Sequence, residues 1–194
     1  MILNNFENVK PIYKIYDGVF TDAECDQILE KQIGSSITLT NQDNEVLTNY
    51  IDKSYNFFTY EITELSEEIE FYETRLMNYV LDANARIFGY NIWGVEKPPF
   101  LMTFKPGYVY GKHEDLLRYS IEPNDRKFSV FAFINNDDPN IPVAKIHFDQ
   151  DDQVVEGKKG SIIIFPSFLT YAIESSKISL RQLLHCHIIG PKFR

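Results

Sequence analysis

The hydrophobic pattern of the first hundred residues predicts two helices. Residues 64–88 carry an apolar residue at every third or fourth position, as one face of an amphipathic helix does, and their glutamates fall mostly on the other face. Gly89 is expected to end this helix. A shorter helix is expected over residues 22–32, because Thr21 and Glu24 have the spacing of a capping box.

From residue 100 onward the pattern changes to short strand-like runs separated by turn signals such as Pro106-Gly107. Strands are expected over residues 101–105, 127–134, 143–148, 153–155, 161–165, 169–173 and 179–188, with an earlier one at 13–16. Many short strands that follow helices favour an α+β, mainly β chain, in which a sandwich or barrel has helices packed outside it.

The composition is that of a folded, acidic protein. A length of 194 residues suits one domain, and 44% hydrophobic residues with 14% aromatic ones exclude a disordered chain. The 28 acidic and 19 basic residues give a net charge of −9, so neither nucleic acid nor an anionic membrane is an expected partner. The longest apolar run, residues 162–165, is far shorter than the roughly 20 residues that span a bilayer.

The N-terminus and the cysteines predict the compartment. The first residues lack the basic and apolar regions of a signal peptide. Cys25 and Cys186 share no metal-binding spacing, and both are expected to be reduced and buried. These features together predict a cytoplasmic protein.

A His-x-Asp pair, His113 and Asp115, is the first candidate for chemistry. At the end of a strand, residues i and i+2 point the same way, so the imidazole and the carboxylate can grip one face of a metal ion. With a second histidine they make the facial triad of non-haem iron oxygenases. The chain has a second copy, His147 and Asp149, and either pair alone also fits a polar loop.

The residues around the first pair resemble the 2-oxoglutarate- and Fe(II)-dependent dioxygenases of the prolyl 4-hydroxylase type. That family carries an aromatic-x-x-Gly-x-x-Tyr-x-x-His-x-Asp run, matched here by Phe104, Gly107, Tyr110, His113 and Asp115. The later elements follow in the family's order: Lys127 to Ser129 leading to Asn135, Gly160 to Ser167, and Arg181 with Gly190-Pro191. The strand at 13–16, Phe20 and the helix with Glu24 also look like the family's entry, so the resemblance covers most of the chain and is thinnest between residues 35 and 98.

This resemblance implies a fold and a domain plan. The expected core is a double-stranded β-helix, a jelly roll of the cupin-like kind, with the N-terminal helices packed on its outer sheet. The whole chain, residues 1–194, is then one prolyl 4-hydroxylase-like domain, in which residues 1–98 support a jelly-roll core at 99–194.

The resemblance also assigns roles. His113 and Asp115 are expected to be catalytic and to bind Fe(II), while Arg181 holds the distal carboxylate of 2-oxoglutarate, a task that suits its planar fork. A cation in the apolar strand around Arg181 needs an anion, although an edge-strand arginine facing solvent is the alternative. Tyr110 is expected to line the same pocket, and Tyr108 more often packs in the core. Ascorbate is an optional reductant.

The pattern departs from the family at the second iron-binding histidine, where this chain has Tyr171. A phenol has a pKa of about 10 and must lose its proton to bind a metal well. Three outcomes stay open: Tyr171 is the third metal ligand, water takes that place, or the site is dead. His185 and His187 share the face of Arg181 but lie about 13 and 20 Å along the strand from it, so packing or hydrogen bonding is expected of them.

Three functions follow. The first is an oxygenase that takes 2-oxoglutarate and O₂, releases succinate and hydroxylates a peptidyl proline or a similar small substrate; an acidic surface favours a neutral or basic target. The second is a catalytically impaired pseudoenzyme that acts as a binding or interaction module, favoured by Tyr171, by Phe104 without the family's hydroxyl, and by an altered turn at 141–146. The third is a sugar-binding barrel, which predicts no role for Arg181.

Overall fold

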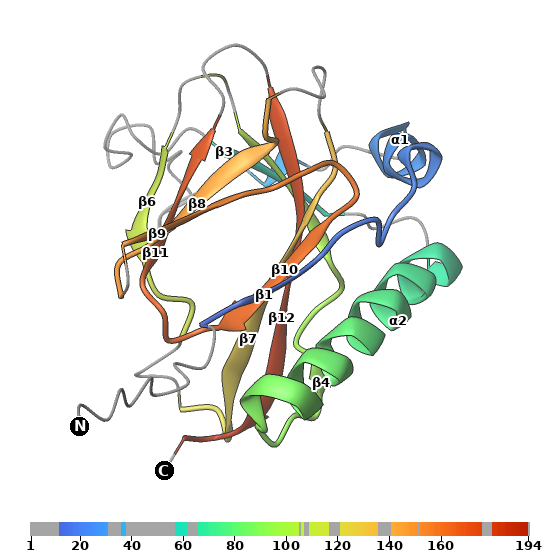
Figure 1. Ribbon diagram of the computed structural model, residues 1–194. Coiled ribbons are helices and arrows are strands. Elements are labelled where there is room, and N and C mark those ends of the chain that lie inside the picture. The colour runs from blue at the N-terminus through green and yellow to red at the C-terminus, as the bar shows by residue number, and fades with distance from the viewer. Residues whose placement is uncertain are drawn as a thin grey trace, which may run out of the picture.

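The computed structural model describes residues 12–30, 36–37, 57–61, 66–104, 106, 109–116, 121–135, 141–150, 152–175 and 180–193. Two antiparallel sheets face each other, and the two longer helices lie beside one of them (Figure 1). The mainly β, jelly-roll fold expected from the sequence is thereby confirmed, with its helices on the outer face of one sheet.

A capping box begins the first helix, and a left-handed glycine ends the second. Helix α1 is Asp22–Glu30, α2 is Ser66–Ala83, and a π-helical segment, η1, continues it over Asn84–Phe88. The capping box is confirmed, since the Thr21 backbone N–H donates to Glu24 at 2.8 Å and the Glu24 N–H donates to the Thr21 hydroxyl at 3.2 Å. Gly89 ends the second helix in the left-handed conformation, with φ of 72°, as predicted.

The larger sheet has the strand order β1-β10-β7-β12-β5-β3-β2, and β4 pairs separately with β12. Its strands are β1 Lys14–Tyr16, β2 Ser36–Ile37, β3 Phe57–Glu61, β4 Gly94–Val95, β5 Phe100–Phe104, β7 Asn124–Phe133, β10 Ile162–Pro166 and β12 Arg181–Pro191. Strands from the first half of the chain therefore join the same sheet as those of the second half.

The smaller sheet has the order β6-β11-β8-β9. Its strands are β6 Val109–His113, β8 Ala144–Phe148, β9 Gln153–Glu156 and β11 Tyr171–Ser175. Strand β11 begins two residues later than the sequence predicted, because residues 168–170 form a turn in which the Leu169 N–H donates to the Pro166 carbonyl at 3.0 Å.

Two hydrophobic cores follow from the alternation of side chains along the strands of the larger sheet. The outer core lies under the helices, where Leu184 and Cys186 of β12 join Leu76 and Val80 of α2. The inner core lies between the two sheets. It includes Leu183, which lies on the opposite face of β12. By the same alternation, Arg181, His185 and His187 point into the inner layer.

Several sequence expectations find their outcome here. Cys25 and Cys186 are free and buried, as predicted. Within the described residues no helix is long and apolar enough to cross a membrane. The expected helix ends at 31–32 and 64–65, and the strand ends at Lys105 and Ser179, lie outside the described residues. The division of the chain at residue 98 stays a prediction.

Candidate active site

His113 and Tyr171 meet because their strands are neighbours in the smaller sheet. His113 ends β6, Tyr171 begins β11, and the two residues are cross-strand partners. The His113 Nε2 lies 3.0 Å from the Tyr171 hydroxyl, and the ring centroids lie 4.4 Å apart. Tyr171 is fully buried, whereas the side chain of His113 is 24% exposed.

Asp115 joins them from the loop after β6. Its backbone N–H donates to the carbonyl of Ser167 at 3.0 Å, which ties the loop to the turn before β11. Its carboxylate accepts hydrogen bonds from the Tyr171 hydroxyl at 2.8 Å and from the Ser129 hydroxyl at 2.5 Å, and Oδ1 lies 3.5 Å from His113 Nε2. The structure thus brings together the three residues that the sequence analysis put forward as metal ligands.

The hydrogen bonds leave more acceptors than protons at this point. His113 Nδ1 lies 2.7 Å from the Gly111 carbonyl, which only accepts, so Nδ1 carries the ring proton and Nε2 has a lone pair when the ring is neutral. The one hydroxyl proton of Tyr171 goes to Asp115. An imidazole lone pair, a phenol oxygen and a carboxylate oxygen therefore converge, which favours a bound cation or a protonated His113.

The spacing fits a metal ion. Cis ligands of a metal with bonds of about 2.1 Å lie roughly 3.0 Å apart in an octahedron and 3.4 Å apart in a tetrahedron. His113 Nε2 lies 3.0 Å from the Tyr171 hydroxyl and 3.5 Å from Asp115 Oδ1, and the Tyr171 hydroxyl lies 2.8 Å from the other carboxylate oxygen, Oδ2. The phenol suits the ion only after it loses its proton.

Burial and neighbours set the charge of each group. Burial alone would raise the pKa of Asp115, but His113 and His187 hold it well below its usual range, so the carboxylate is ionised. Burial, and next the Asp115 charge, raise the pKa of Tyr171 well above its usual range. Burial would lower the pKa of His113, yet its contacts with Asp115 and Gly111 raise it overall. Without a metal, the site is an ionised carboxylate facing a neutral phenol.

Arg181 and Tyr110 lie on either side of Phe104. Arg181 is fully buried at the start of β12, and its cross-strand partner in β5 is Phe104. The ring of Tyr110 in β6 lies 6.1 Å from that of Phe104 and 4.2 Å from that of His113. A buried cation thus lies on the inner face of one sheet and a tyrosine next to His113 on the other. Tyr108 lies outside the described residues.

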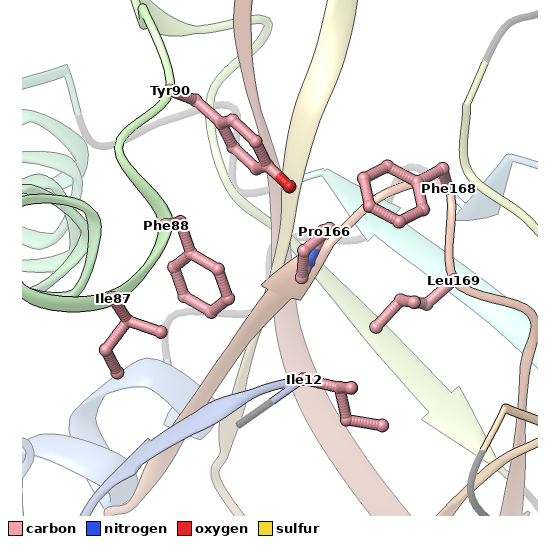
Figure 2. Close-up of a pocket in the computed structure, with 7 residues that line it drawn as sticks. All are labelled: Ile12, Ile87, Phe88, Tyr90, Pro166, Phe168 and Leu169. Atoms are coloured by element: carbon pink, nitrogen blue, oxygen red, sulfur yellow. The ribbon is translucent and has the colours of Figure 1, made fainter. Parts of the chain in front are cut away.

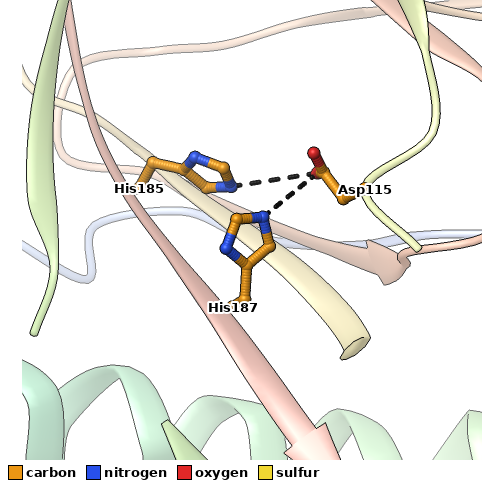
Figure 3. A group of neighbouring side chains, drawn as sticks. All are labelled: Asp115, His185 and His187. Atoms are coloured by element: carbon orange, nitrogen blue, oxygen red, sulfur yellow. Dashed lines mark ion pairs between the residues drawn. The ribbon is translucent and has the colours of Figure 1, made fainter. Parts of the chain in front are cut away.

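His185 and His187 also reach Asp115 (Figure 3). The Asp115 Oδ2 lies 3.9 Å from His185 Nε2 and 3.5 Å from His187 Nε2. In β12, His187 is the cross-strand partner of Ser129, which hydrogen-bonds Asp115, so the carboxylate lies level with the two histidines. Their distance from Arg181 along the strand, on which the sequence analysis relied, gave no sign of this.

Comparison with known proteins identifies the fold. The sequence matches no protein-family model and no curated protein. The structure matches the collagen prolyl hydroxylase of Paramecium Bursaria Chlorella virus-1, seen in its 2-oxoglutarate complex, with a TM-score of 0.67 at 15% identity, over 93% of this chain and 97% of that one. The protein has the prolyl hydroxylase-like fold of the 2-oxoglutarate- and iron-dependent oxygenases.

Other proteins with this oxygenase fold differ in activity. A prolyl hydroxylase from Trichoplax adhaerens, in complex with a hypoxia inducible factor peptide fragment, matches with a TM-score of 0.68 at 12% identity, over 92% of this chain and 84% of that one. The α-ketoglutarate-dependent epimerase SnoN from nogalamycin biosynthesis matches with 0.65 at 10%, over 94% of this chain and 79% of that one. At these identities the likeness establishes the fold, and the reaction has to be argued from the residues.

The second His-x-Asp pair has a different environment in this oxygenase fold. His147, on β8, lies 3.1 Å from the Glu174 carboxylate of β11. Asp149 makes an ion pair of 2.7 Å with Lys112. Both contacts are partly exposed and neither involves Asp115, which agrees with a polar surface pair, the alternative that the sequence left open.

An apolar pocket of about 330 Å³ lies near the turn after β10 (Figure 2). It is lined by Ile12, Ile87, Phe88, Tyr90, Pro166, Phe168 and Leu169. Phe88 and Tyr90 pack against the outer core of the oxygenase fold, whereas Ile12 and Phe168 pack against the inner core, so the pocket lies where the two cores meet. None of the candidate ligands lines it.

Proposed function

We propose that this protein is a 2-oxoglutarate- and Fe(II)-dependent oxygenase. The observation that carries the proposal is the convergence of His113, Asp115 and Tyr171 within 3.5 Å of one another, with fewer protons than acceptors among them. A fold shared with known 2-oxoglutarate-dependent enzymes supports it, since the same sheets can place these side chains around a metal ion.

His113 Nε2 and the Asp115 carboxylate would hold the iron, and Tyr171 would bind as a phenolate. The Gly111 carbonyl accepts the Nδ1 proton of His113 and so fixes the ring orientation, as acceptors behind metal-bound histidines commonly do. Ser129 holds the carboxylate of Asp115 in place. When bound, iron and 2-oxoglutarate supply the oxidising chemistry, in which O₂ and 2-oxoglutarate give succinate, CO₂ and one oxygen atom inserted into a substrate C–H bond.

Arg181 and Tyr110 would bind 2-oxoglutarate. Arg181 is a buried, permanently charged side chain in the inner layer, and a guanidinium can grip a carboxylate with two parallel hydrogen bonds. The phenol of Tyr110, beside His113, can donate a further hydrogen bond to the same co-substrate. These residues bind and orient 2-oxoglutarate and keep its acidic end out of water.

The substrate we propose is a peptidyl proline or a similarly small residue of a peptide or protein. Two of the three similar structures compared above are prolyl hydroxylases, one of them seen with a peptide. The net charge of −9 favours a neutral or basic peptide over an acidic one. Ascorbate is the reductant to include in the assay.

A pseudoenzyme of the same fold is the second candidate, and one observation favours it. The Tyr171 hydroxyl already donates to Asp115 and touches His113, so the phenol closes the site in the absence of a metal. Metal binding then has to displace a buried hydrogen bond, which costs about 1.5–3 kcal/mol for a charged acceptor.

Anaerobic Fe(II) titration, followed by measurement of succinate on addition of 2-oxoglutarate and O₂, separates the two candidates. We expect Fe(II)-dependent succinate formation that His113→Ala abolishes and that Arg181→Gln reduces through a higher KM for 2-oxoglutarate. Tyr171→His should raise Fe(II) affinity by roughly 10- to 100-fold. His147→Gln is the matched control and should leave both unchanged.

Succinate formation by the wild-type protein supports the oxygenase. Tight binding of a peptide by a protein that makes no succinate with any added metal supports the pseudoenzyme instead. If Tyr171→His leaves Fe(II) affinity and 2-oxoglutarate turnover unchanged, Tyr171 does not occupy the third ligand position.

A further inference from the structure

We propose that Asp115, His185 and His187 form a second transition-metal site on the inner side of Asp115, separate from the position between His113 and Tyr171. This site does not rest on the oxygenase activity, because two of its three side chains, His185 and His187, have no part in the proposed reaction. The two positions share the carboxylate of Asp115. His113 lies 3.5 Å from Oδ1, whereas Oδ2 accepts the hydrogen bonds of Tyr171 and Ser129 and also faces the β12 histidines.

The geometry is close to that of a bound ion. One ligand atom from each of the three residues lies within 4.8 Å of the others, and the two distances to Asp115 Oδ2 are 3.5 and 3.9 Å. A point equidistant from three atoms so spaced lies about 2.4 Å or less from each, against about 2.0–2.2 Å for bonds from zinc to imidazole nitrogen and carboxylate oxygen. Small side-chain shifts therefore complete the coordination, and Figure 3 shows both rings directing a nitrogen at the carboxylate.

The two imidazoles have unsatisfied nitrogens in a dry interior. His185 is 3% exposed and His187 is 8% exposed. Neither ring nitrogen of His185, nor Nε2 of His187, has a hydrogen-bond partner among the described residues. An unsatisfied buried polar atom costs about 1–3 kcal/mol, so two such side chains next to a buried carboxylate point to a missing ligand.

The surroundings hold both rings in position for that ligand. His185 stacks on Phe131, with ring centroids 4.1 Å apart and planes 14° from parallel. The other nitrogen of His187, Nδ1, lies 3.7 Å from the Glu96 carboxylate, which Arg126 holds through contacts of 2.9 and 2.7 Å. Carboxylates behind metal-bound histidines commonly orient the ring through a hydrogen bond, and at 3.7 Å the Glu96 carboxylate needs a small shift to make that bond with Nδ1.

The donor set selects the class of ion. Two imidazoles and one carboxylate suit Zn²⁺, Fe²⁺, Co²⁺ and Ni²⁺, whereas Mg²⁺ and Ca²⁺ prefer oxygen ligands alone. The composition is that of the two-histidine, one-carboxylate triad, which the outer position lacks because Tyr171 takes the place of a histidine.

Co²⁺ titration of purified, EDTA-treated protein tests the site, because the visible bands of Co²⁺ report its coordination without any enzymatic turnover. The double variant His113→Ala/Tyr171→Phe removes the outer position, and we expect it still to bind one Co²⁺ per chain. Adding His185→Phe, which keeps the stacking on Phe131, and His187→Gln should weaken that binding by roughly 100-fold or more. His147→Gln, a partly exposed histidine paired with Glu174, is the control and should change nothing.

Each outcome of the Co²⁺ titration either supports or overturns the inner metal site. Loss of Co²⁺ binding with His185→Phe or with His187→Gln, in chains that keep the wild-type circular dichroism and cooperative unfolding, supports the site. Unchanged Co²⁺ affinity in both variants overturns it, as does a His113→Ala/Tyr171→Phe chain that binds no Co²⁺ while remaining folded. Should His185→Phe or His187→Gln unfold the protein, the Co²⁺-induced rise in the melting temperature of the His113→Ala/Tyr171→Phe chain is measured instead: a rise supports the inner site, and no rise overturns it. The oxygenase proposal is tested by a different measurement: it is refuted if the wild-type protein forms no succinate.

Discussion

The hydrogen bond between Tyr171 and Asp115 can be tested by removing a single oxygen. In Tyr171→Phe the ring remains, so its packing against Phe165 and Phe131, with centroids 4.9 and 5.8 Å away, is kept. The substitution removes the proton donated to Asp115 at 2.8 Å and the contact with His113 at 3.0 Å. Any change in stability therefore reports the polar contacts and not the core.

The expected loss is large for one atom. A hydrogen bond to a charged acceptor contributes about 1.5–3 kcal/mol, and here the acceptor is an ionised, buried carboxylate. For a chain of this length each kcal/mol shifts the melting temperature by roughly 2–4 °C, so we expect Tyr171→Phe to melt about 3–12 °C below wild type. Tyr16→Phe is the matched control: its hydroxyl donates to Asp82 at 2.6 Å, but that carboxylate is exposed, so the loss should be clearly smaller.

The effect of Tyr171→Phe should depend on pH. Because the pKa of Asp115 is depressed in the folded state, the stability that its charge contributes is present above its unfolded value of about 3.9 and is lost as the pH falls through the folded pKa. The difference between wild type and Tyr171→Phe should therefore be full at pH 7 and shrink in strong acid, where the hydrogen bond becomes neutral. Urea unfolding in EDTA at pH 7, 5 and 3 measures both free energies.

Two results would refute this reasoning. A Tyr171→Phe chain as stable as wild type at pH 7 would show that the phenol does not donate to Asp115, and the convergence of the three candidate ligands would then be wrong. A loss no larger than that of Tyr16→Phe would show that the carboxylate at the site is hydrated and not buried.

Two further predictions concern the fold. Gly160→Ala should lower the free energy of unfolding by about 3 kcal/mol, because residue 160 has a φ of +77° and an added Cβ would lie 2.2 Å from the Phe20 carbonyl oxygen, whereas Gly18→Ala, with a φ of +66° and open space, should lose only about 1–2 kcal/mol in the same urea titration. Equal losses would contradict the close approach at Phe20. Burial raises the pKa of Cys25 to about 11 and that of Cys186 to about 12, so neither thiol should react with Ellman's reagent at pH 8 in the folded protein, and both should react in urea; labelling of the folded chain would contradict their burial.

The sequence predicted the central strands of the larger sheet better than its shortest strands. Near-continuous apolar runs located strands β7, β10 and β12, because most residues of these strands are buried. The two-residue strands β2 and β4 were not predicted, since two positions are too few to show a period. Their place in the sheet depends on pairing with strands far along the chain.

The site was predictable where chemistry is local and not where it depends on register. His113 and Asp115 are two residues apart, and Tyr171 lies at a fixed distance from Arg181, so a motif could identify all three. The approach of His187 to Asp115 follows from the pairing of His187 with Ser129 across β12 and β7, which no spacing along the chain encodes. The distance along β12 between Arg181 and the histidines was the wrong quantity to use. The Asp115 carboxylate approaches His185 and His187 from the loop after β6, in the other sheet.

Asp115 belongs to both proposed metal positions, and this determines which substitutions are informative. Removing its charge with Asp115→Asn would take a ligand from the outer and the inner position at once, and would also weaken the hydrogen bonds from Tyr171 and Ser129. Loss of metal in that variant therefore agrees with either position. The histidines differ, because His113 approaches Oδ1 from the smaller sheet while His187 approaches Oδ2 from the larger one. Substituting the histidines separately is what assigns a bound ion to one side of the carboxylate or the other.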